Sequence, residues 1–427
     1  MQNGRTIKAN KTRPASSNLV IGLTGPFGSG CGEMRSALEG LGFKSFRVSA
    51  HIRDEVKSSG KLIEKGKADW RKALQDHGNT RRKEDLGYWA KKVAEEIEKS
   101  DVGDCDIAID GLRNFSEVQE MRRMFPLFFL VAICAPKDER WKRVRNDYAQ
   151  YREFERDDRR DSNEDVNWGQ NVQKCVDDAD YVFYNDQSLF VSPPGSGETP
   201  DSEKIQRTLR AEAKDFVALM KGDAMRPPRT EEVQIAAAYA HSNSSRCLKR
   251  HVGAVITVGR NGSEFPISMG YNENPPNIPT CSDEACYKDE DLISKLNAQG
   301  KHIYCPSCGS EHVGLQEPWI CKSCGQSFRE WLYPSRNMEL CTAIHAEERA
   351  ILSLGGRSAE GGTLYVTTFP CFQCARLILD AGIKRVVYVE AYPIKNTAEF
   401  LKAKNVDVQP FSGFTARAFF RVFRRVD

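Results

Sequence analysis

The sequence predicts an α/β protein with two domains, each built on a sheet covered by helices. In the first half, short apolar runs of strand length alternate with helical stretches, and the first run leads into a glycine-rich turn. Alternation of this kind is typical of a parallel sheet with helices on both faces. In the second half, helices and strands alternate around a cysteine-rich insertion, which predicts a second α/β domain. A chain of 427 residues is also too long for one ordinary core.

Apolar runs and their periodicity place the elements of the first half. Strands are expected at four runs, namely 18–24, 104–110, 127–134 and 180–185. Helices are expected where apolar residues recur every three or four positions, from about Cys31 to Gly40 and over 83–99 and 203–220. The stretch 192–202 is rich in proline, glycine and serine and is expected to be a flexible insertion.

Changes in composition set the expected domain boundaries. Residues 1–17 are polar and are expected to form a flexible leader before a first domain at 18–221. GDAMRPPRT, at 222–230, has the proline-rich character of a linker. The second domain is then expected to cover 231–427, with the cysteine-rich insertion at about 281–330.

Composition also excludes some classes of function. The net charge of +3 gives no global signal for polyanion binding, so any contact with nucleic acid would depend on a local patch. No window approaches the roughly 20 apolar residues that a membrane span requires, and the N-terminus lacks a secretion signal. Six of the 14 cysteines lie in three C-x-x-C pairs, which is metal-ligand spacing. We therefore expect a cytoplasmic protein with thiolate-bound zinc and no membrane partner.

The strongest chemical signal is the pair of motifs His345-Ala346-Glu347 and Pro370-Cys371-Phe372-Gln373-Cys374. One imidazole and two thiolates give three zinc ligands and leave a fourth position for water, as in catalytic zinc sites. Cys371 and Cys374 would share one helix face, whereas His345 and Glu347 can converge only near a helix N-terminus. The spacing H-x-E…P-C-x-x-C matches the known pattern of zinc deaminases.

Each residue of this set has an expected role. Zinc would lower the pKa of its water towards neutrality and so create a nucleophile for C4 of cytosine. Glu347, which is not a ligand, would take the water proton, pass it to N3 and protonate the departing ammonia. The alternative is a structural zinc with a chance carboxylate. Such a site would normally have a fourth protein ligand, and neither motif supplies one.

Three further segments of 231–427 carry motifs, namely SSRCLKRHVGAVI (244–256), GYNENP (270–275) and LYVTTFPCFQCARLILDAGIKRVVYVEAYP (364–393). Together with the zinc motifs they resemble the deoxycytidylate deaminase family of the cytidine deaminase fold, which implies an α/β/α domain. The resemblance implies that Asn272 bonds the deoxyribose, that Tyr392 lies beside the base and that Arg246 or Lys249 meets phosphate. The alternative for Asn272 is a turn residue with positive φ. The alternative for Arg246 and Lys249 is an ordinary solvated surface.

Two C-x-x-C pairs in the insertion predict a zinc ribbon. CPSC (305–308) and CKSC (321–324) lie twelve residues apart, and each is followed by glycine. Two such knuckles close the shell of a structural zinc with four thiolates, those of Cys305, Cys308, Cys321 and Cys324. Nearby, Cys281 and Cys286 could be another ligand pair or buried free thiols. The ribbon departs from the plain family pattern and could roof the active site, form a subunit interface or touch a polynucleotide.

GPFGSGCG (25–32) follows a strand and opens a helix, which is the context of a phosphate-binding loop. Asp110 ends a strand, where a Walker B carboxylate would lie. The expected nucleotide-binding residues are therefore Gly25, Gly28, Ser29, Gly30, Cys31, Gly32 and Asp110. Cys31 and Gly32 replace the lysine and the hydroxyl residue of G-x-x-x-x-G-K-[ST], so phosphoryl transfer is doubtful while binding of a nucleotide or phosphate remains expected.

The arginine-rich stretch 143–160 resembles the lid that clamps phosphates in nucleotide kinases; a solvated helix with alternating charges is the alternative. Within it, Asp157 and Asp158 could order arginines or bind a metal. A degenerate P-loop kinase-like domain fused to a deoxycytidylate deaminase resembles the bacterial antiphage deoxycytidine deaminases. That resemblance implies hydrolysis of dCMP, dCTP or both to uridine forms, control through the N-terminal domain, an inhibitory small RNA in some members and homo-oligomers, commonly hexamers.

Three other functions remain as alternatives. A polynucleotide deaminase is expected to have a basic, aromatic surface around its pocket. Only FTARAFFRVFRR (414–425) has that character, and the spacing of its aromatic residues also fits a helix packed on a core. A bifunctional dCMP kinase–deaminase is opposed by Cys31 and Gly32. A non-catalytic scaffold is opposed by Glu347, because a scaffold has no use for a carboxylate beside an open zinc position.

Overall fold

The computed structural model describes thirteen stretches of the chain, residues 18–59, 70–162, 164, 166–185, 202–260, 262–283, 286, 302–305, 307–313, 320–325, 328, 341–389 and 395–423. The expected leader, most of the expected flexible insertion and parts of the cysteine-rich insertion lie outside them. The described residues form two compact units. Unit 1 takes its residues from Met1–Val233, Val389–Tyr392 and Pro410–Asp427, and unit 2 from Gln234–Tyr388 and Pro393–Gln409.

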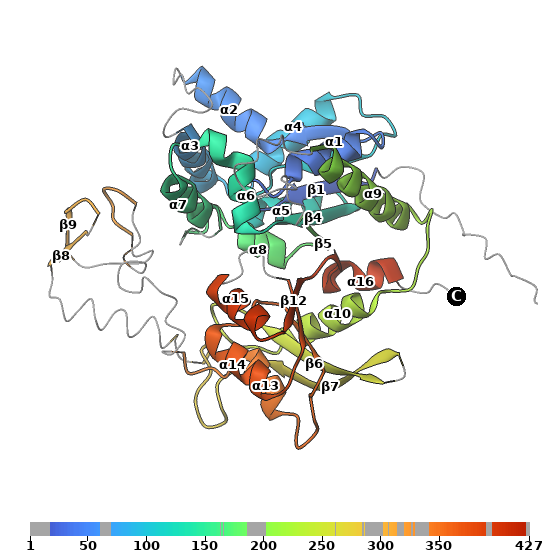
Figure 1. Cartoon of the computed structure of the whole chain (residues 1–427). Coiled ribbons are helices and arrows are strands. Elements are labelled where there is room, and N and C mark those ends of the chain that lie inside the picture. The colour runs from blue at the N-terminus through green and yellow to red at the C-terminus, as the bar shows by residue number, and fades with distance from the viewer. Residues whose placement is uncertain are drawn as a thin grey trace, which may run out of the picture. The chain divides into compact units, whose positions relative to one another are not determined.

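The sheet of unit 1 contains six strands, β1 (Val20–Thr24), β2 (Lys44–Arg47), β3 (Ile107–Asp110), β4 (Phe128–Cys134), β5 (Tyr181–Tyr184) and β13 (Gly413–Phe414). Their order is β13-β5-β4-β1-β3-β2 (Figure 1). The first five strands pair in parallel, as the alternation of strands and helices predicts. The sixth runs antiparallel to β5 at the edge of the sheet.

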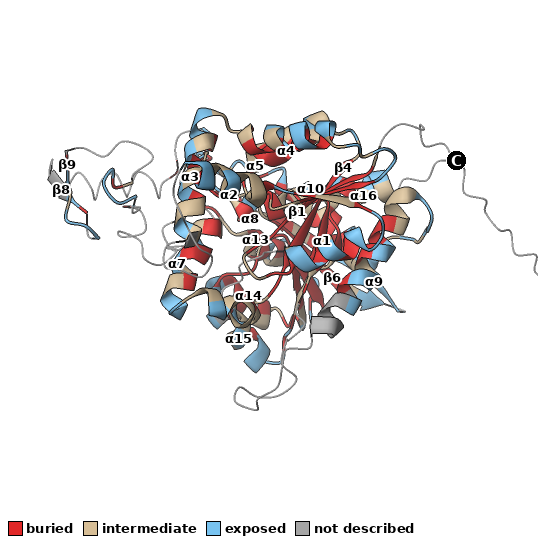
Figure 2. Ribbon diagram, turned by 90° about the horizontal axis from the view of Figure 1, so that it is seen from above, coloured by how far each residue is buried: buried red, intermediate tan, exposed pale blue. Residues whose placement is uncertain are grey.

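Alternate residues of β1 face opposite layers of helices. Ile21 and Leu23 join a buried cluster with α1 (Cys31–Glu39), α9 (Ser202–Lys221) and α16 (Ala416–Phe423). Gly22 faces the other way, where a Cβ would lie 2.5 Å from the ring of Phe128, so only glycine fits there. Three helices contact the sheet on this side, α4 (Tyr88–Lys99), α5 (Phe115–Met124) and α8 (Val172–Asp177). Figure 2 shows the resulting pattern, with buried residues on the strands and exposed residues on the outer sides of the helices.

The remaining helices of unit 1 are α2 (Val48–Ser58), α3 (Trp70–Glu84), α6 (Lys137–Val144), a 3-10 turn (Arg145–Asp147) and α7 (Tyr151–Ser162). The prediction of one helix over 83–99 is wrong at its start, because α3 ends at Glu84 and α4 begins at Tyr88. A turn separates them, in which the Gly87 N–H donates to Asp85 Oδ1 at 2.9 Å. This side-chain bond gives the backbone an alternative to continuing the helix.

The structure corrects the expected second domain at 231–427, because residues 410–423 belong to unit 1. The reason is apolar packing at the edge of the first sheet. Phe414 is fully buried, with its ring centroid 4.9 Å from that of Tyr181 and 5.7 Å from that of Phe216. Thr415 continues the junction, since its N–H donates to Asp180 O at 3.1 Å. The helix expected in 414–425 therefore packs on a core, but on that of the first unit.

Unit 2 is built on a mixed sheet of five strands, β6 (Gly253–Arg260), β7 (Ser263–Tyr271), β10 (Thr363–Val366), β11 (Arg385–Tyr388) and β12 (Asp407–Pro410). Their order is β12-β11-β10-β6-β7. The helices α13 (Ala346–Leu352), α14 (Phe372–Asp380) and α15 (Lys395–Ala403) share one buried cluster with the strands. The opposite face carries α10 (Thr230–Ser242), which lies so close that a Cβ on Gly253 would be 1.8 Å from Ala238 O. This is the α/β/α arrangement that the sequence predicts.

The described part of the insertion holds a two-stranded hairpin, β8 (His302–Tyr304) paired with β9 (Glu311–Val313). The first C-x-x-C pair, Cys305 and Cys308, lies in the turn between these two strands. None of the helices in the described part of the chain combines the length and the apolar character that a membrane crossing needs.

Candidate metal and phosphate sites

Three predicted zinc ligands converge at the starts of two helices. His345 is the N-cap of α13 and Cys371 is the N-cap of α14. His345 Nδ1 lies 3.2 Å from Cys374 Sγ and 3.4 Å from Cys371 Sγ, and all three ligand atoms lie within 4.8 Å of one another. Nitrogen and sulfur donors in this number are the set of a catalytic zinc site. The residues therefore fit a zinc ion, with three protein ligands and one position left for water.

Small residues allow α13 to approach the sheet closely enough to form this site. A Cβ on Gly270 of β7 would be 2.3 Å from Ala346 O and 2.5 Å from Ala350 N. Ser268 Oγ, two residues earlier on the same face, donates to Ala350 O. The start of α13, and with it His345, is thus fixed by the absence of a side chain at Gly270.

Replacing Gly270 with alanine is expected to displace α13, because the new methyl group would overlap the helix backbone. Overpacking of this kind costs about 1–3 kcal/mol of stability. We expect lower zinc content as well, which elemental analysis of the purified protein would measure. Gly259→Ala is the matched control on β6, since a Cβ there would meet no atom within 4 Å. Equal zinc content and melting temperature in both variants would contradict the role of Gly270.

Glu347 lies in the first turn of α13, two residues after the ligand His345, and is 4% exposed. Burial raises the pKa of its carboxyl to about 7. Hydrogen bonds from Cys374 and His345 lower the pKa of the Cys371 thiol to about 4, which favours the thiolate that binds metal. A carboxyl that titrates near neutrality beside a metal-ligand set is suited to both accepting and donating a proton.

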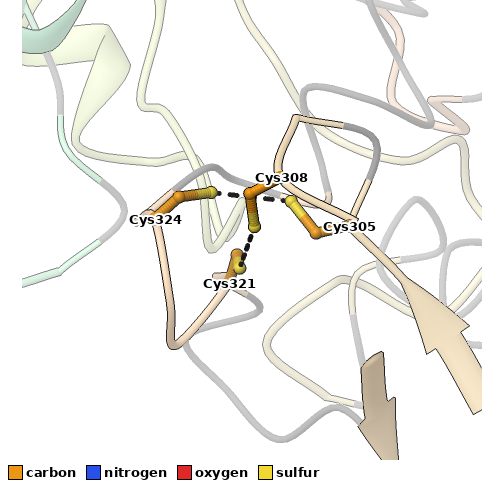
Figure 3. A group of neighbouring side chains, drawn as sticks. All are labelled: Cys305, Cys308, Cys321 and Cys324. Atoms are coloured by element: carbon orange, nitrogen blue, oxygen red, sulfur yellow. Dashed lines mark hydrogen bonds between the residues drawn. The ribbon is translucent and has the colours of Figure 1, made fainter. Parts of the chain in front are cut away.

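The four cysteines of the predicted ribbon also converge (Figure 3). The Sγ atoms of Cys305 and Cys324 are 3.6 Å apart, as are those of Cys308 and Cys321, and all four lie within 4.8 Å. Each pair lies in a tight turn that ends at a glycine, with φ of 72° at Gly309 and 74° at Gly325. The N–H of that glycine donates to the carbonyl of the first cysteine of the pair at 2.8 Å. Four thiolates from two such turns fit a structural zinc.

Sequence reasoning missed a histidine beside this cluster. His312 on β9 is 7% exposed, and its Nε2 lies 3.2 Å from Cys321 Sγ. Its ring packs edge-on to Phe328 at a centroid distance of 5.3 Å. Lone histidines carry many roles, so the sequence alone had no signal for this contact. Cys281 and Cys286 are both 8% exposed, and burial raises the pKa of Cys281 to about 11, which agrees with the buried-thiol alternative.

Cys321→Ala is expected to remove one zinc per chain and lower the melting temperature of the protein, because a structural zinc contributes folding energy directly. Elemental analysis and differential scanning calorimetry would measure both effects. Cys105→Ala is the control, since Cys105 is an exposed free thiol outside both clusters. If Cys321→Ala retains all the zinc of the parent protein, the ribbon assignment is wrong.

The structure gives Asn272 a local structural role. Its Oδ1 accepts the Val252 N–H at 2.7 Å and its Nδ2 donates to Arg250 O at 2.9 Å, so both ends of the amide hold the approach to β6. The alternative interpretation, in which Asn272 is a turn residue with positive φ, is wrong, because Asn272 is not among the residues with positive φ. Arg246 Nε lies 3.4 Å from Glu273 Oε2, while Lys249 is exposed. Tyr392 lies outside the described residues.

Glu273 connects this loop to the zinc ligands and was missed by sequence reasoning. Its side chain is 7% exposed and accepts the N–H groups of Arg246 and Asn274, each at 2.9 Å. Its backbone pairs with Ile344, the residue before His345, through bonds of 3.0 and 3.2 Å. The GYNENP motif therefore holds the segment that carries the histidine ligand.

The glycine-rich loop of unit 1 has the conformation of a phosphate-binding loop. It joins β1 to α1, which begins at Cys31, and its positive φ values at Gly25, Gly28 and Gly30 are 152°, 76° and 114°. A Cβ on Gly32 would meet no atom within 4 Å, so the position of the missing hydroxyl is open. Burial, with the charge of Asp110 adding to it, raises the pKa of the Cys31 thiol to about 12. The thiol therefore stays neutral, and unlike lysine it has no cationic form.

Three polar side chains support the loop from behind, and sequence reasoning missed all of them as loop contacts. Arg143 donates to Gly28 O at 3.0 Å, and Asn185 Nδ2 donates to Ser29 O at 2.8 Å. Arg140 donates to Phe27 O at 3.2 Å and pairs with both carboxylate oxygens of Asp158. Because Asp158 is 3% exposed, the stretch 143–160 is more than a solvated helix.

Comparison with known proteins matches residues 228–390 to the cytidine and deoxycytidylate deaminase zinc-binding region. Deoxycytidylate deaminase of Enterobacteria phage T4 is 38% identical over 159 residues, covering 36% of this chain and 75% of the relative. That of Schizosaccharomyces pombe is 28% identical over 199 residues, covering 45% and 48%. Among solved structures, shikimate kinase from Acinetobacter baumannii in complex with shikimate shares 15% identity, covers 49% of this chain and 96% of its own, and gives a TM-score of 0.30.

Proposed function

The chain belongs to the deoxycytidylate deaminase family, and we propose that it removes the 4-amino group of deoxycytidine nucleotides by zinc-dependent hydrolysis. The observation that carries the proposal is the convergence of His345, Cys371 and Cys374 next to the buried carboxyl of Glu347. The similarity to phage and yeast deoxycytidylate deaminases makes dCMP the first expected substrate.

The reaction converts dCMP and water to dUMP and ammonia. A zinc ion held by His345, Cys371 and Cys374 would supply the Lewis acidity that makes water a better nucleophile. Glu347 accepts a proton from this water as its oxygen bonds to C4, and delivers the proton to N3 of the base. The second water proton moves through Glu347 to the 4-amino group, the C4–N bond breaks, and ammonia leaves with the bond electrons while the C4 carbonyl forms. A carboxyl with a pKa of about 7 can perform both transfers.

The proposal extends to dCTP as a second substrate and to depletion of these nucleotides in antiviral defence. Its support is the resemblance to antiphage deaminases, which covers both halves of the chain. In the same proposal, the loop residues Gly25, Gly28, Ser29, Gly30, Cys31 and Gly32, with Asp110, bind a nucleotide that regulates the enzyme. A homo-oligomer, commonly a hexamer, and an inhibitory small RNA follow from the same resemblance. Asn272, Tyr392, Arg246 and Lys249 remain the proposed substrate contacts, and Cys305, Cys308, Cys321 and Cys324 the proposed structural zinc ligands.

The polynucleotide alternative loses its main sequence feature. Within the described part of the stretch 414–425, Phe414 and Ala418 are fully buried in the core of unit 1, as expected for a helix that packs on a core. The test is to incubate the purified protein with dCMP, dCTP, CTP or single-stranded DNA and to measure ammonia. Release from dCMP is expected; release from DNA alone would contradict the proposal.

A further inference from the structure

An arginine that follows another strand of the sheet lies against the glycine-rich loop. Arg113 follows β3, and its guanidinium carbon lies 4.2 Å from the ring centroid of Phe27 in the loop. Its charge acts on the thiol of Cys31 and is the strongest of the arginine charges acting on Asp110. The guanidinium of Arg113 therefore lies against Phe27 of the loop, close enough to Cys31 and Asp110 for its charge to act on both.

A buried carboxylate holds this arginine in place. Asp161 of α7 is fully buried, and its Oδ1 accepts a charged hydrogen bond from Arg113 Nη1. Its other oxygen, Oδ2, is buried and has no hydrogen-bond partner among the described residues. A carboxylate taken out of water normally uses both oxygens, so Asp161 is only half satisfied. Asp161 accepts from Arg113 the kind of hydrogen bond that a phosphate oxygen would accept.

A second guanidinium lies on the same ring. Arg71 of α3 has its guanidinium carbon 4.6 Å from the ring centroid of Phe27 and pairs with Asp147 at 2.9 Å. Arg71 lies on α3 and Asp161 lies on α7. These two helices lie beside each other (Figures 1 and 2) and are joined by an ion pair between Asp76 and Arg160. The loop thus faces two cations, and each pairs with a carboxylate of residues 145–162. We call these residues the lid segment, because they overlap the lid-like stretch 143–160.

Asn185 is a second buried side chain that packs against the loop. Asn185 is 1% exposed, and its Nδ2 donates to Ser29 O and lies 2.6 Å from where a Cβ on Gly30 would be. Its Oδ1 is buried and accepts no hydrogen bond from any described residue. Asn185 therefore holds the backbone of the loop in place through Ser29.

We propose that Arg113 supplies the positive charge that Cys31 cannot, and that the phosphate chain of a bound nucleotide replaces Asp161 on it. This inference rests on the proposed binding of a nucleotide by the loop, and it assigns Arg113 as the residue that binds the negative charge of the phosphates. Binding then releases α7 from Arg113, which gives the loop a way to change the lid segment when a nucleotide arrives.

The test is equilibrium dialysis of the full chain with radiolabelled ATP, with a parallel arm containing inorganic pyrophosphate. ATP is chosen because its base is not a substrate of the proposed cytosine chemistry. Asp161→Asn removes the competing charge and keeps the shape, so ATP is expected to bind several-fold more tightly. The double variant Arg113→Gln/Asp161→Asn leaves no unpaired charge buried and is expected to bind about tenfold more weakly than Asp161→Asn, or worse.

Arg152→Gln, an exposed arginine of the same helix, is the control for loss of one positive charge and is expected to bind ATP as the parent does. Equal ATP affinity in the parent, Asp161→Asn and the double variant would overturn the role of Arg113 while leaving nucleotide binding by the loop in place. No ATP or pyrophosphate binding by any variant would overturn both. Tighter binding of pyrophosphate than of ATP would overturn a nucleotide as the ligand of the loop. Ammonia release from dCMP, measured on the same samples, separates these outcomes from failure of the deaminase proposal.

Discussion

The Glu347→Ala variant is expected to lose dCMP deamination by about 10²–10⁴-fold in kcat, the usual effect of removing a general acid–base group. Glu347 is buried beside the metal ligands, so no water-exposed group can take its place in moving protons. His345, Cys371 and Cys374 remain, so the zinc content should match that of the parent protein. Ammonia release and elemental analysis on the same preparation would measure both quantities.

Glu348→Ala is the matched control, because it removes a carboxyl from the same helical turn at a residue outside the predicted ligand set. It is expected to retain activity within a few-fold of the parent. Glu347→Gln should be as inactive as the alanine variant, since glutamine keeps the shape of the side chain but cannot exchange a proton. A Glu347 variant that turns over dCMP normally would show that the mechanism is wrong.

The second large effect is expected at Phe414, whose replacement by alanine should destabilise unit 1 by about 3–5 kcal/mol. The ring is fully buried between Tyr181 and Phe216, and its loss leaves a cavity at the junction of sheet and helix. Hydrogen–deuterium exchange would measure the effect separately in each unit. We expect reduced protection in β4 and β5 of unit 1 and unchanged protection in β10 of unit 2.

Phe420→Ala provides the control, because Phe420 lies on the same helix but is 73% exposed. Its removal is expected to change stability by no more than about 0.5 kcal/mol, as for most surface substitutions. If both phenylalanine variants exchange like the parent protein, the tail does not stabilise the first unit.

The metal-ligand sets could be predicted because each depends on spacing within one short segment. Cys371 and Cys374 lie three residues apart at a helix start, and the two knuckles of the ribbon repeat the same local turn. The convergence of His345 and Glu347 required a helix beginning between them, and α13 begins at Ala346. The glycine-rich loop was recognisable for the same reason, since a strand, a turn and a helix follow one another directly.

The contacts that one sequence could not predict join residues far apart along the chain. Arg113 pairs with Asp161 across 48 positions, and Thr415 reaches Ala179 across 236. No periodicity or motif connects such residues, because their meeting depends on the order of strands in the sheet. Glu273 was part of a recognised motif, but its pairing with Ile344 depends on how two loops of unit 2 meet.

The edge strand β13 has a consequence for synthesis of the protein on the ribosome. Residues 234–409, which contain almost all of the second unit, must emerge before Gly413 and Phe414 do. Until then the edge of β5 has unpaired backbone groups, and the apolar surface that α16 later covers is exposed. The first half of the nascent chain is therefore exposed to aberrant strand pairing throughout translation of the catalytic half, and chaperones that shield open sheet edges would act in that interval.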